Sequence, residues 1–417
     1  MDHKPVFDGP SAPEGDAFYA PLPELPHGTF GDPIFLRPLD NPEAVLTHGQ
    51  NWLVLYRSEA ADGEPIAVSG IIALPNDPPR DGQGYPIVTF AHGTVGVCPT
   101  CGPSRDYVGS SAHPMNKYPQ RLLNGFLDQG WAVAMTDYEG LGVEGRRHPY
   151  LLGKSEAHGV LDIVETTRRL FGEYVGEQYA IMGHSQGGQA ALFAAHHGGR
   201  VPGLVGVAAM APANHPYGIV RAGSLLPATD GGFAFTPLFL SGAVVGDTTI
   251  DVDKVLSDTA LLVWPDVLTR CRAGLSDSDS WGGLLGIQQF RSTLLNPYPA
   301  KPNAEQTKFE DQLRLMNPDL PISVPIRISQ SADDQRVKTE TTEVQLPGFT
   351  ISVRGVDALA EEELPVTNPD NPPLYVRYER GEVMVPNPDP DNLGAHFAML
   401  DYDRNAVTTW LAERFAG

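Results

Sequence analysis

The stretch IMGHSQGGQA, residues 181–190, places Ser185 between two glycines, Gly183 and Gly187. Apolar residues of strand character precede the serine (QYAIMG, 178–183), and a run of helical character follows it (GGQAALFAAHH, 187–197). A strand, a sharp glycine-flanked turn and a helix are the context of a nucleophile elbow, in which the serine backbone is strained and its hydroxyl projects clear of the sheet. The alternative is an ordinary hydroxyl in a glycine-rich bend, and the context favours the nucleophile.

Strand and helix patterns alternate along the chain on both sides of this turn. The strand patterns cover residues 51–59, 66–75, 86–93, 131–137, 178–183, 203–213 and a run that begins at 324, and the helix patterns cover 117–129 and about 155–171. Such alternation predicts the α/β class, with a mostly parallel central sheet flanked by helices and wound by right-handed crossovers. Ser185 then lies at the carboxyl end of a strand, where parallel sheets place their chemistry.

Residues 214–319 differ in texture from the alternating part of the chain. They carry the apolar runs FAFTPLFL (233–240), LLVWPDVL (261–268) and WGGLLGIQQF (281–290) among clusters of glycine, aspartate and serine. We expect an inserted, mainly helical cap subdomain, or lid, over the active site; an ordinary helical subdomain with its own core also fits. Residues 1–213 and 320–417 then form the core, with an irregular wrapping segment over about 1–30 that is rich in proline and glycine.

The charge composition argues against two classes of partner. The 417 residues include 51 acidic and 29 basic side chains, for a net charge of −22. Nucleic acid backbones and anionic lipid surfaces repel such a protein, so neither is an expected partner. No apolar run approaches the roughly 18 residues that span a bilayer, so we expect no stable membrane insertion. The oligomeric state is left open, and a monomer is compatible with the sequence.

A serine hydroxyl becomes a nucleophile when a histidine takes its proton and a carboxylate orients that histidine. With this type of elbow the chain order is serine, acid, histidine, with the acid and the histidine on loops after late strands. The strand pattern VPIRISQ (324–330) ends in SADDQRV (331–337), which offers Asp333 and Asp334, and we choose Asp334. His396 is the only histidine beyond this acid, in a glycine loop before a C-terminal helix. We therefore expect a triad of Ser185, Asp334 and His396.

Negative charge develops on the carbonyl oxygen of the substrate when the serine attacks, and two backbone N–H groups are expected to bind it. One is the N–H of Gln186, the residue after the nucleophile. The second comes from the loop after an earlier strand, FAHGTVG (90–96), where we assign the N–H of Thr94. His92 in this loop is interpreted as a bracing residue and not as a proton carrier.

These residues predict a serine-dependent hydrolase that acts through an acyl-enzyme. The family resemblance given in the next paragraph implies a carboxylic ester hydrolase, an esterase or lipase that acts on a small-molecule or lipid ester. The mechanism requires neither a metal nor an organic cofactor. A peptidase or an acyltransferase with the same triad is an alternative, because only the pocket and the acceptor differ. A non-catalytic binding module is a further alternative, in which we would expect a triad member to be missing.

Several segments resemble the secretory lipase family of α/β-hydrolases, the group that includes fungal lipase A-like enzymes and many bacterial extracellular esterases. They are DAFYAPLPELPHGTFGD (16–32), AHGTVGVCPTCGPSRD (91–106), TDYEGLG (136–142), HPYLLGKSEAHGVLD (148–162), GHSQGGQAALFAA (183–195) and QSADDQRV (330–337). The resemblance covers most of the chain and matches the family aspartate to Asp334. It implies the α/β-hydrolase fold, a lid over an acyl-binding pocket, and hydrolysis of acylglycerols or smaller esters. The segment between Asp334 and His396 is longer than in typical members and includes an apparent hairpin, YVRYERGEVMV (375–385).

Cys98, Cys101 and Cys271 are the only cysteines. A C-x-x-C pair is typical of redox sites or of half a zinc site, and we find no second ligand set at comparable spacing, so no metal site is expected. The resemblance to the family suggests a disulfide between Cys101 and Cys271, with a Cys98–Cys101 pair as the rival. A disulfide favours an oxidising compartment, and we expect a secreted or periplasmic protein from which a signal peptide has been removed.

Overall fold

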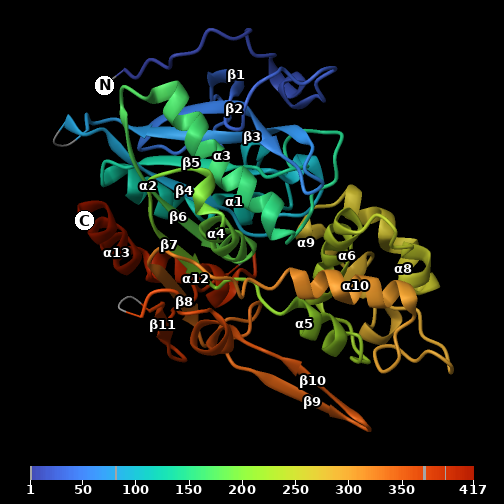
Figure 1. Ribbon diagram of the computed structural model, residues 1–417. Coiled ribbons are helices and arrows are strands. Elements are labelled where there is room, and N and C mark those ends of the chain that lie inside the picture. The colour runs from blue at the N-terminus through green and yellow to red at the C-terminus, as the bar shows by residue number, and fades with distance from the viewer. Residues whose placement is uncertain (1, 80–81, 370–371, 390) are drawn as a thin grey trace.

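The computed structural model describes residues 2–79, 82–369, 372–389 and 391–417. Its centre is a nine-stranded sheet with the strand order β1-β2-β3-β5-β4-β6-β7-β8-β11, and a two-stranded hairpin, β9–β10, stands apart from it (Figure 1). The strands are β1 (Pro33–Pro38), β2 (Gly49–Glu59), β3 (Pro65–Pro75), β4 (Tyr85–Ala91), β5 (Ala132–Thr136), β6 (Val175–His184), β7 (Leu204–Met210), β8 (Ile326–Ser331), β9 (Thr342–Leu346), β10 (Phe349–Val353) and β11 (Leu374–Tyr378).

The helices fill most of the intervals between these strands. They are α1 (His113–Lys117), α2 (Gln120–Asp128), α3 (Gly153–Phe171), α4 (Gln186–His196), α5 (Pro216–Gly223), α6 (Phe235–Gly246), α7 (Val252–Val255), α8 (Asp258–Val263), α9 (Arg272–Leu275), α10 (Ala304–Leu315), α11 (Val356–Ala358), α12 (Gly394–Tyr402) and α13 (Arg404–Ala416).

The direction of the strands confirms the predicted mostly parallel sheet. Strands β5, β4, β6, β7, β8 and β11 run parallel, whereas β1, β2 and β3 form an antiparallel extension that joins the sheet at β5. Helices α3 and α4 pack together against β4 and β6, and α2, α12 and α13 form a second group against the sheet. Strands β5 and β8 are therefore buried along their whole length, as expected for parallel strands that helices cover.

Two of the expected helices are divided in the structure. The pattern at 117–129 belongs to α1 and α2, which meet at Pro119; the proline has no N–H to continue the helical hydrogen bonds. The C-terminal helix is two helices, α12 and α13, with Asp403 at the joint. The buried carboxylate of Asp403 accepts a hydrogen bond of 2.6 Å from Arg327 on β8, which holds the joint against the sheet.

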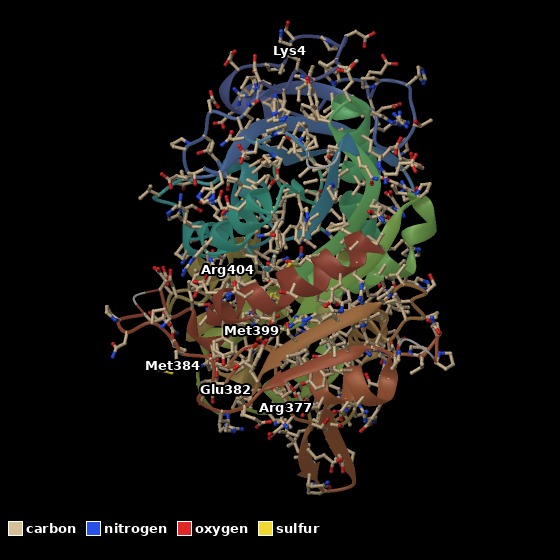
Figure 2. All side chains as sticks on the ribbon, turned by 90° about the vertical axis from the view of Figure 1, so that its left-hand side faces the viewer. Lys4, Arg377, Glu382, Met384, Met399 and Arg404 are labelled. Carbon is tan, nitrogen blue, oxygen red and sulfur yellow. A yellow bond between two sulfur atoms is a disulfide. The ribbon has the colours of Figure 1, made fainter. Side chains whose placement is uncertain are left out.

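The predicted hairpin at 375–385 is wrong. Its first half is β11, which pairs in parallel with β8, and the residues that follow leave the sheet. The carboxylate of Asp333 accepts a hydrogen bond of 2.6 Å from the N–H of Gly381 and fixes the turn, and Val383 is buried in the core. The true hairpin is β9–β10, which projects beyond the body of the molecule in both views (Figures 1 and 2).

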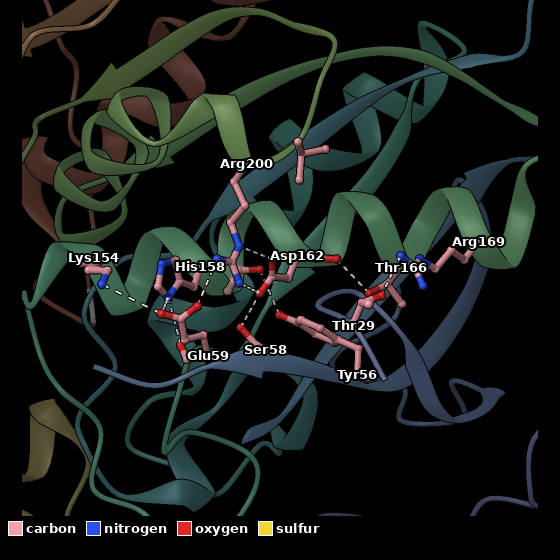
Figure 3. A network of polar contacts seen from close by, with 12 residues as sticks. Thr29, Tyr56, Ser58, Glu59, Lys154, His158, Asp162, Thr166, Arg169 and Arg200 are labelled. Carbon is pink, nitrogen blue, oxygen red and sulfur yellow. Dashed lines mark hydrogen bonds and ion pairs between the residues drawn. The ribbon is translucent and has the colours of Figure 1, made fainter. Parts of the chain in front are cut away.

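The N-terminal segment runs along the molecule with a single short 3-10 turn, Gly15–Tyr19, among its described residues. It is anchored by buried aromatic side chains at Phe18 and Tyr19 and by a backbone hydrogen bond of 2.8 Å from Val6 to Leu170. Helix α3 is tied to β2 and to the residues after α4 through Asp162, which accepts hydrogen bonds of 2.7 Å from both Ser58 and Arg200 (Figure 3). These contacts hold in place the helix that leads to β6.

Residues between β7 and β8 form a separate group of helices, α5 to α10, beside the sheet (Figure 1). They have a hydrophobic cluster of their own, built around Trp281, Phe309 and Leu238. Tyr150 and Leu151 of the main sheet domain also belong to this cluster, so the helical group is seated on the loop before α3. Among the described residues, none of the helices combines the length and the apolar composition that a bilayer crossing requires.

Candidate active site

Ser185 occupies the turn between β6 and α4, at the carboxyl end of a central parallel strand. Its backbone has φ 60° and ψ −119°, a conformation that L-residues rarely adopt and that costs about 1–3 kcal/mol. The turn is held by a hydrogen bond of 2.9 Å from the N–H of Ser185 to the carbonyl of Met210 on β7. The strained turn lifts the side chain out of the sheet, as the sequence predicts for an elbow.

The two flanking glycines are required by close contacts between main-chain atoms. A Cβ at Gly183 would lie 1.9 Å from the carbonyl oxygen of Gly187, and a Cβ at Gly187 would lie 1.8 Å from the carbonyl oxygen of Ala91. Both distances are far inside van der Waals contact, and the atoms approached are backbone. The turn can therefore close only without a side chain at Gly183, and it can meet the end of β4 only without a side chain at Gly187.

Asp334 and His396 are brought together by the loop after β8 and by the first turn of α12. The Nδ1–H of His396 donates a hydrogen bond of 2.7 Å to Oδ2 of Asp334, and both side chains are almost fully buried. The other carboxylate oxygen, Oδ1, accepts from the backbone N–H groups of Arg336 (2.8 Å) and Val337 (3.0 Å). Asp334 is thus fixed on both oxygens, and it sets the tautomer that leaves Nε2 of His396 unprotonated.

His396 lies beside the elbow through its contact with His184, the residue before Ser185. Nε2–H of His184 donates a hydrogen bond of 2.8 Å to the carbonyl of His396, and the two ring centroids are 4.5 Å apart. Burial and the neighbouring His396 hold the pKa of His184 well below its usual range, so this ring is neutral. Within the described residues the hydroxyl of Ser185 makes no hydrogen bond of its own.

Two backbone N–H groups near the serine have no acceptor among the described residues. They belong to Gln186, the first residue of α4, and to Thr94, in the loop after β4. The loop meets the elbow directly, since a Cβ at Gly93 would lie 3.5 Å from Cβ of Ser185. The Thr94 hydroxyl is fixed by a 2.8 Å hydrogen bond with the hydroxyl of Tyr150. N–H donors that are free and rigidly held can bind a developing negative charge.

The side chain of Gln186 is anchored in a buried polar cluster beneath the elbow. Its Nε2–H donates to Oε1 of Glu156 at 2.6 Å and to Nε2 of His148 at 2.9 Å. Oε1 of Glu156 also accepts from the N–H of Leu151 at 2.9 Å. Burial raises the pKa of Glu156 to about 8 and lowers the pKa of His148 to about 3. Both groups are consequently neutral at pH 7, which lets them lie together without a buried net charge.

A cavity of about 780 Å³ opens over Ser185. Its apolar wall comes largely from α5 and α6, including Ile219, Val220 and Phe239, and from the hairpin residues Val344 and Val353. The volume lies within the range of small-molecule sites. The part of the chain that the structure describes contains no group of three or more His, Cys, Asp or Glu residues placed to hold a metal ion.

Cys101 and Cys271 form a disulfide that joins the loop after β4 to the start of α9. Cys98, the rival partner, is a buried free thiol. His92 bonds through Nδ1 to the carbonyl of Gly93 at 2.8 Å, which braces the same loop. The segment that carries Thr94 is therefore fixed at both ends.

Sequence reasoning did not identify the residues that support these groups. Glu156, His148 and Tyr150 lie on a loop and a helix whose pattern indicates only packing, and no spacing rule links them to Gln186. His184 stands inside the glycine-serine motif, and its position next to the nucleophile was an available signal. Arg272 and Arg336 line the cavity, and only their places beside Cys271 and Asp334 in the chain could have pointed to them.

Comparison with known proteins gives a sequence match over the middle of the chain. Residues 115–215, which include α3, the elbow and α4, match the family model described as secretory lipase. A curated protein named Lipase 7 from Candida albicans is 26% identical over 192 residues, which cover 44% of this chain and 43% of that protein. The chain thus spans less than half the length of this curated relative.

Solved structures share the fold over nearly the whole chain. Lipase A of Candida antarctica in its closed state gives a TM-score of 0.62 at 15% identity, over 84% of this chain and 78% of that one. A ligand-bound rice cell wall degrading esterase from Xanthomonas oryzae gives a TM-score of 0.64 at 16% identity, over 92% of this chain and 97% of that one. A putative hydrolase from Legionella pneumophila gives a TM-score of 0.61 at 16% identity, over 88% of each chain. These likenesses confirm the α/β-hydrolase fold.

Proposed function

We propose that this chain, which belongs to the secretory lipase family, is a serine-dependent carboxylic ester hydrolase of the esterase and lipase class. The observation that carries the proposal is the hydrogen-bonded pair of His396 and Asp334 beside an elbow that presents Ser185 to a cavity. The chemistry needs these three groups at one point, and they come from three distant parts of the chain.

In the proposed reaction Oγ of Ser185 attacks the carbonyl carbon of the ester, and its proton passes to Nε2 of His396. Asp334 stabilises the imidazolium that forms, because Oδ2 already accepts the Nδ1–H. The hydrogen bond between Ser185 and His396 forms when substrate enters, since such contacts often tighten only in the complex. His396 then gives the proton to the departing alcohol, and water releases the acyl group by the same steps in reverse.

The N–H groups of Thr94 and Gln186 are the proposed donors to the carbonyl oxygen. Their lack of acceptors in the free protein supports this role, because the oxyanion replaces no existing hydrogen bond. One such donor contributes about 10²- to 10³-fold to the rate. The anchoring of the Gln186 side chain by Glu156 and His148 keeps the start of α4 from moving as charge develops.

Residues 214–319 are proposed to act as a lid that supplies the pocket for the substrate. Helices α5 and α6 of this segment face the cavity above Ser185. The disulfide between Cys101 and Cys271 ties the lid to the proposed oxyanion loop and supports a secreted or periplasmic location, where disulfides persist.

The test is a series of esters from acetate to palmitate, with amides that match the shorter members. We expect hydrolysis of esters at least about 10²-fold faster than of the matched amides, and loss of both activities in Ser185→Ala. Equal or faster turnover of the amides would support a peptidase. An unchanged rate in Ser185→Ala would refute the proposal for every class of substrate.

A further inference from the structure

Three cationic side chains, Arg272, Arg336 and Lys338, line the cavity that contains Ser185. Among the described residues, none of the three has a carboxylate oxygen within 4.0 Å. The chain has 51 acidic and 29 basic residues, so carboxylates are abundant. Three cations that share one cavity and form no ion pair with the described residues are unexpected in so acidic a chain, and they require an explanation.

Arg272 is the more isolated of the two guanidinium groups. Its Nε is buried and has no hydrogen-bond partner, and its guanidinium lies over the ring of Phe235 at 4.9 Å from the centroid. Burial lowers its pKa, which means that the surroundings oppose the charge. The position of the residue is fixed by a backbone hydrogen bond of 2.8 Å from its N–H to Val95, next to the proposed oxyanion donor Thr94.

Arg336 also lines the cavity and stands two residues after Asp334 in the chain. Its guanidinium lies 5.1 Å from the ring centroid of Phe397 and donates a hydrogen bond of 2.9 Å to the carbonyl of Asn392. Burial and the nearby positive charge of Arg272 lower its pKa to about 10, although the negative charges of Asp334 and Asp389 act in the opposite direction, so Arg336 remains a cation at neutral pH. Each of the two positive charges disfavours the charged form of the other, and an anion that binds both guanidinium groups offsets this repulsion.

We propose that the enzyme takes esters that carry a free carboxylate in the acyl or the alcohol part, and that Arg272 and Arg336 bind this carboxylate. Guanidinium groups donate two parallel hydrogen bonds to a carboxylate, which fixes the orientation of the ester as well as its position. Substrates of this class include the monoesters of dicarboxylic acids. The inference rests on the proposed ester hydrolase function.

Among the described residues, the acidic side chains near the cavity form no direct ion pair with either arginine. The charges of Asp334 and Asp389 reach Arg336, but these carboxylates accept hydrogen bonds from His396 and from the N–H of Gly394. Asp230 and Asp391 are exposed, and neither forms an ion pair with Arg272 or Arg336 in the described part of the chain. The Asp230 carboxylate accepts a hydrogen bond from the N–H of Gly232. The chain has a net charge of −22, but exposed charges farther from the site than the Debye length of about 8 Å are largely screened at physiological salt, whereas the guanidinium groups act by direct contact.

The experiment compares two pairs of esters on the full-length protein. Monoethyl succinate is paired with ethyl butanoate for a charge in the acyl part, and 4-carboxyphenyl butanoate is paired with phenyl butanoate for a charge in the alcohol part. The readout is kcat/KM for the anionic ester divided by that for its neutral partner. This ratio cancels any loss of folded or active protein in a variant, so a damaged variant remains informative.

We expect Arg272→Met and Arg336→Met each to lower this ratio by about 10- to 100-fold in at least one pair, as expected for lost charge-assisted hydrogen bonds. Arg272→Lys keeps the charge and should recover part of the ratio. Arg147→Met is the matched control, because Arg147 also lies over an aromatic ring, Trp264, but does not line the cavity. The control should leave both ratios within about twofold of the wild type.

Ratios that stay unchanged in both pairs, for both arginine variants, would overturn the inference while leaving the ester hydrolase function intact. If neutral esters are not hydrolysed either, the proposed function fails, and the anion site is judged by calorimetry with monoethyl succinate on the Ser185→Ala protein. Binding that Arg272→Met removes would support the site. Heat changes no larger than those with ethyl butanoate would refute it.

Discussion

Replacing Glu156 by glutamine converts the buried carboxyl group beneath the elbow into an amide of the same size. Oε1 keeps its role as acceptor for the N–H of Leu151 and the side chain of Gln186. The substitution removes the ionisable proton of Glu156, because an amide does not titrate. Burial raises the pKa of Glu156 from its ordinary value of 4.5 to about 8. Between these values the folded protein holds a proton that the unfolded chain releases, so the free energy of unfolding falls as pH rises.

The magnitude follows from the two pKa values. A full passage from below pH 4.5 to above pH 8 lowers the free energy of unfolding of the wild type by about 5 kcal/mol through this one group. About 1 kcal/mol of that loss falls between pH 7 and pH 9. In this interval buried histidines with lowered pKa values, such as His148 and His184, contribute little to the pH dependence of stability. The glutamine variant lacks the whole dependence, so its stability relative to wild type should rise by that amount over this interval.

The assay is urea unfolding followed by tryptophan fluorescence at pH 5, 7 and 9, without reductant so that the disulfide stays intact. Glu64→Gln, at an exposed position, controls for the removal of one acidic residue. We expect the difference between Glu156→Gln and wild type to grow steadily with pH and the difference for Glu64→Gln to stay flat. Parallel curves for all three proteins would refute the reasoning, because Glu156 would then titrate normally.

Three further substitutions test the site and its support. Asp334→Asn keeps an oxygen for the N–H groups of Arg336 and Val337 but presents an NH₂ group to His396. The histidine then takes the wrong tautomer, and kcat should fall about 10⁴-fold in ester assays. A loss of kcat below tenfold would contradict this. Cys271→Ser opens a disulfide that closes a separation of 170 residues and should lower the free energy of unfolding by about 5 kcal/mol in urea titrations, whereas unchanged midpoints would count against it. Gly187→Ala should lower both the thermal midpoint and kcat, because the new Cβ would meet a carbonyl oxygen at 1.8 Å; wild-type behaviour would show that the turn relaxes freely.

The sequence predicts the sheet and the elbow because both depend on local patterns. Apolar strand runs and the glycines on either side of Ser185 can be recognised within a window of about ten residues. The order of serine, acid and histidine along the chain then selects Asp334 and His396. The secondary structure around His396 was less accessible. Its place on the first turn of α12, and the break at Asp403, depend on a buried contact with Arg327 of β8, which is distant in the chain.

Contacts between distant segments account for the rest of what the sequence could not predict. The hairpin expected at 375–385 fits the alternation of residues, but β11 joins β8 instead, and Asp333 fixes the following turn. The cluster of Glu156, Gln186 and His148 and the unpaired Arg272 have no spacing that distinguishes them from packing or surface residues. Their properties arise from burial, which only the folded structure defines.

Covalent labelling with a fluorophosphonate probe, followed by peptide mapping, tests the central claim most directly, since the probe reacts with an activated serine and reports the residue that carries it. The account predicts one phosphonyl group per chain on Ser185, no labelling of Ser185→Ala, and much slower labelling of His396→Ala. A folded protein that takes up no probe, or one that is labelled at another serine while Ser185 stays unmodified, would contradict it.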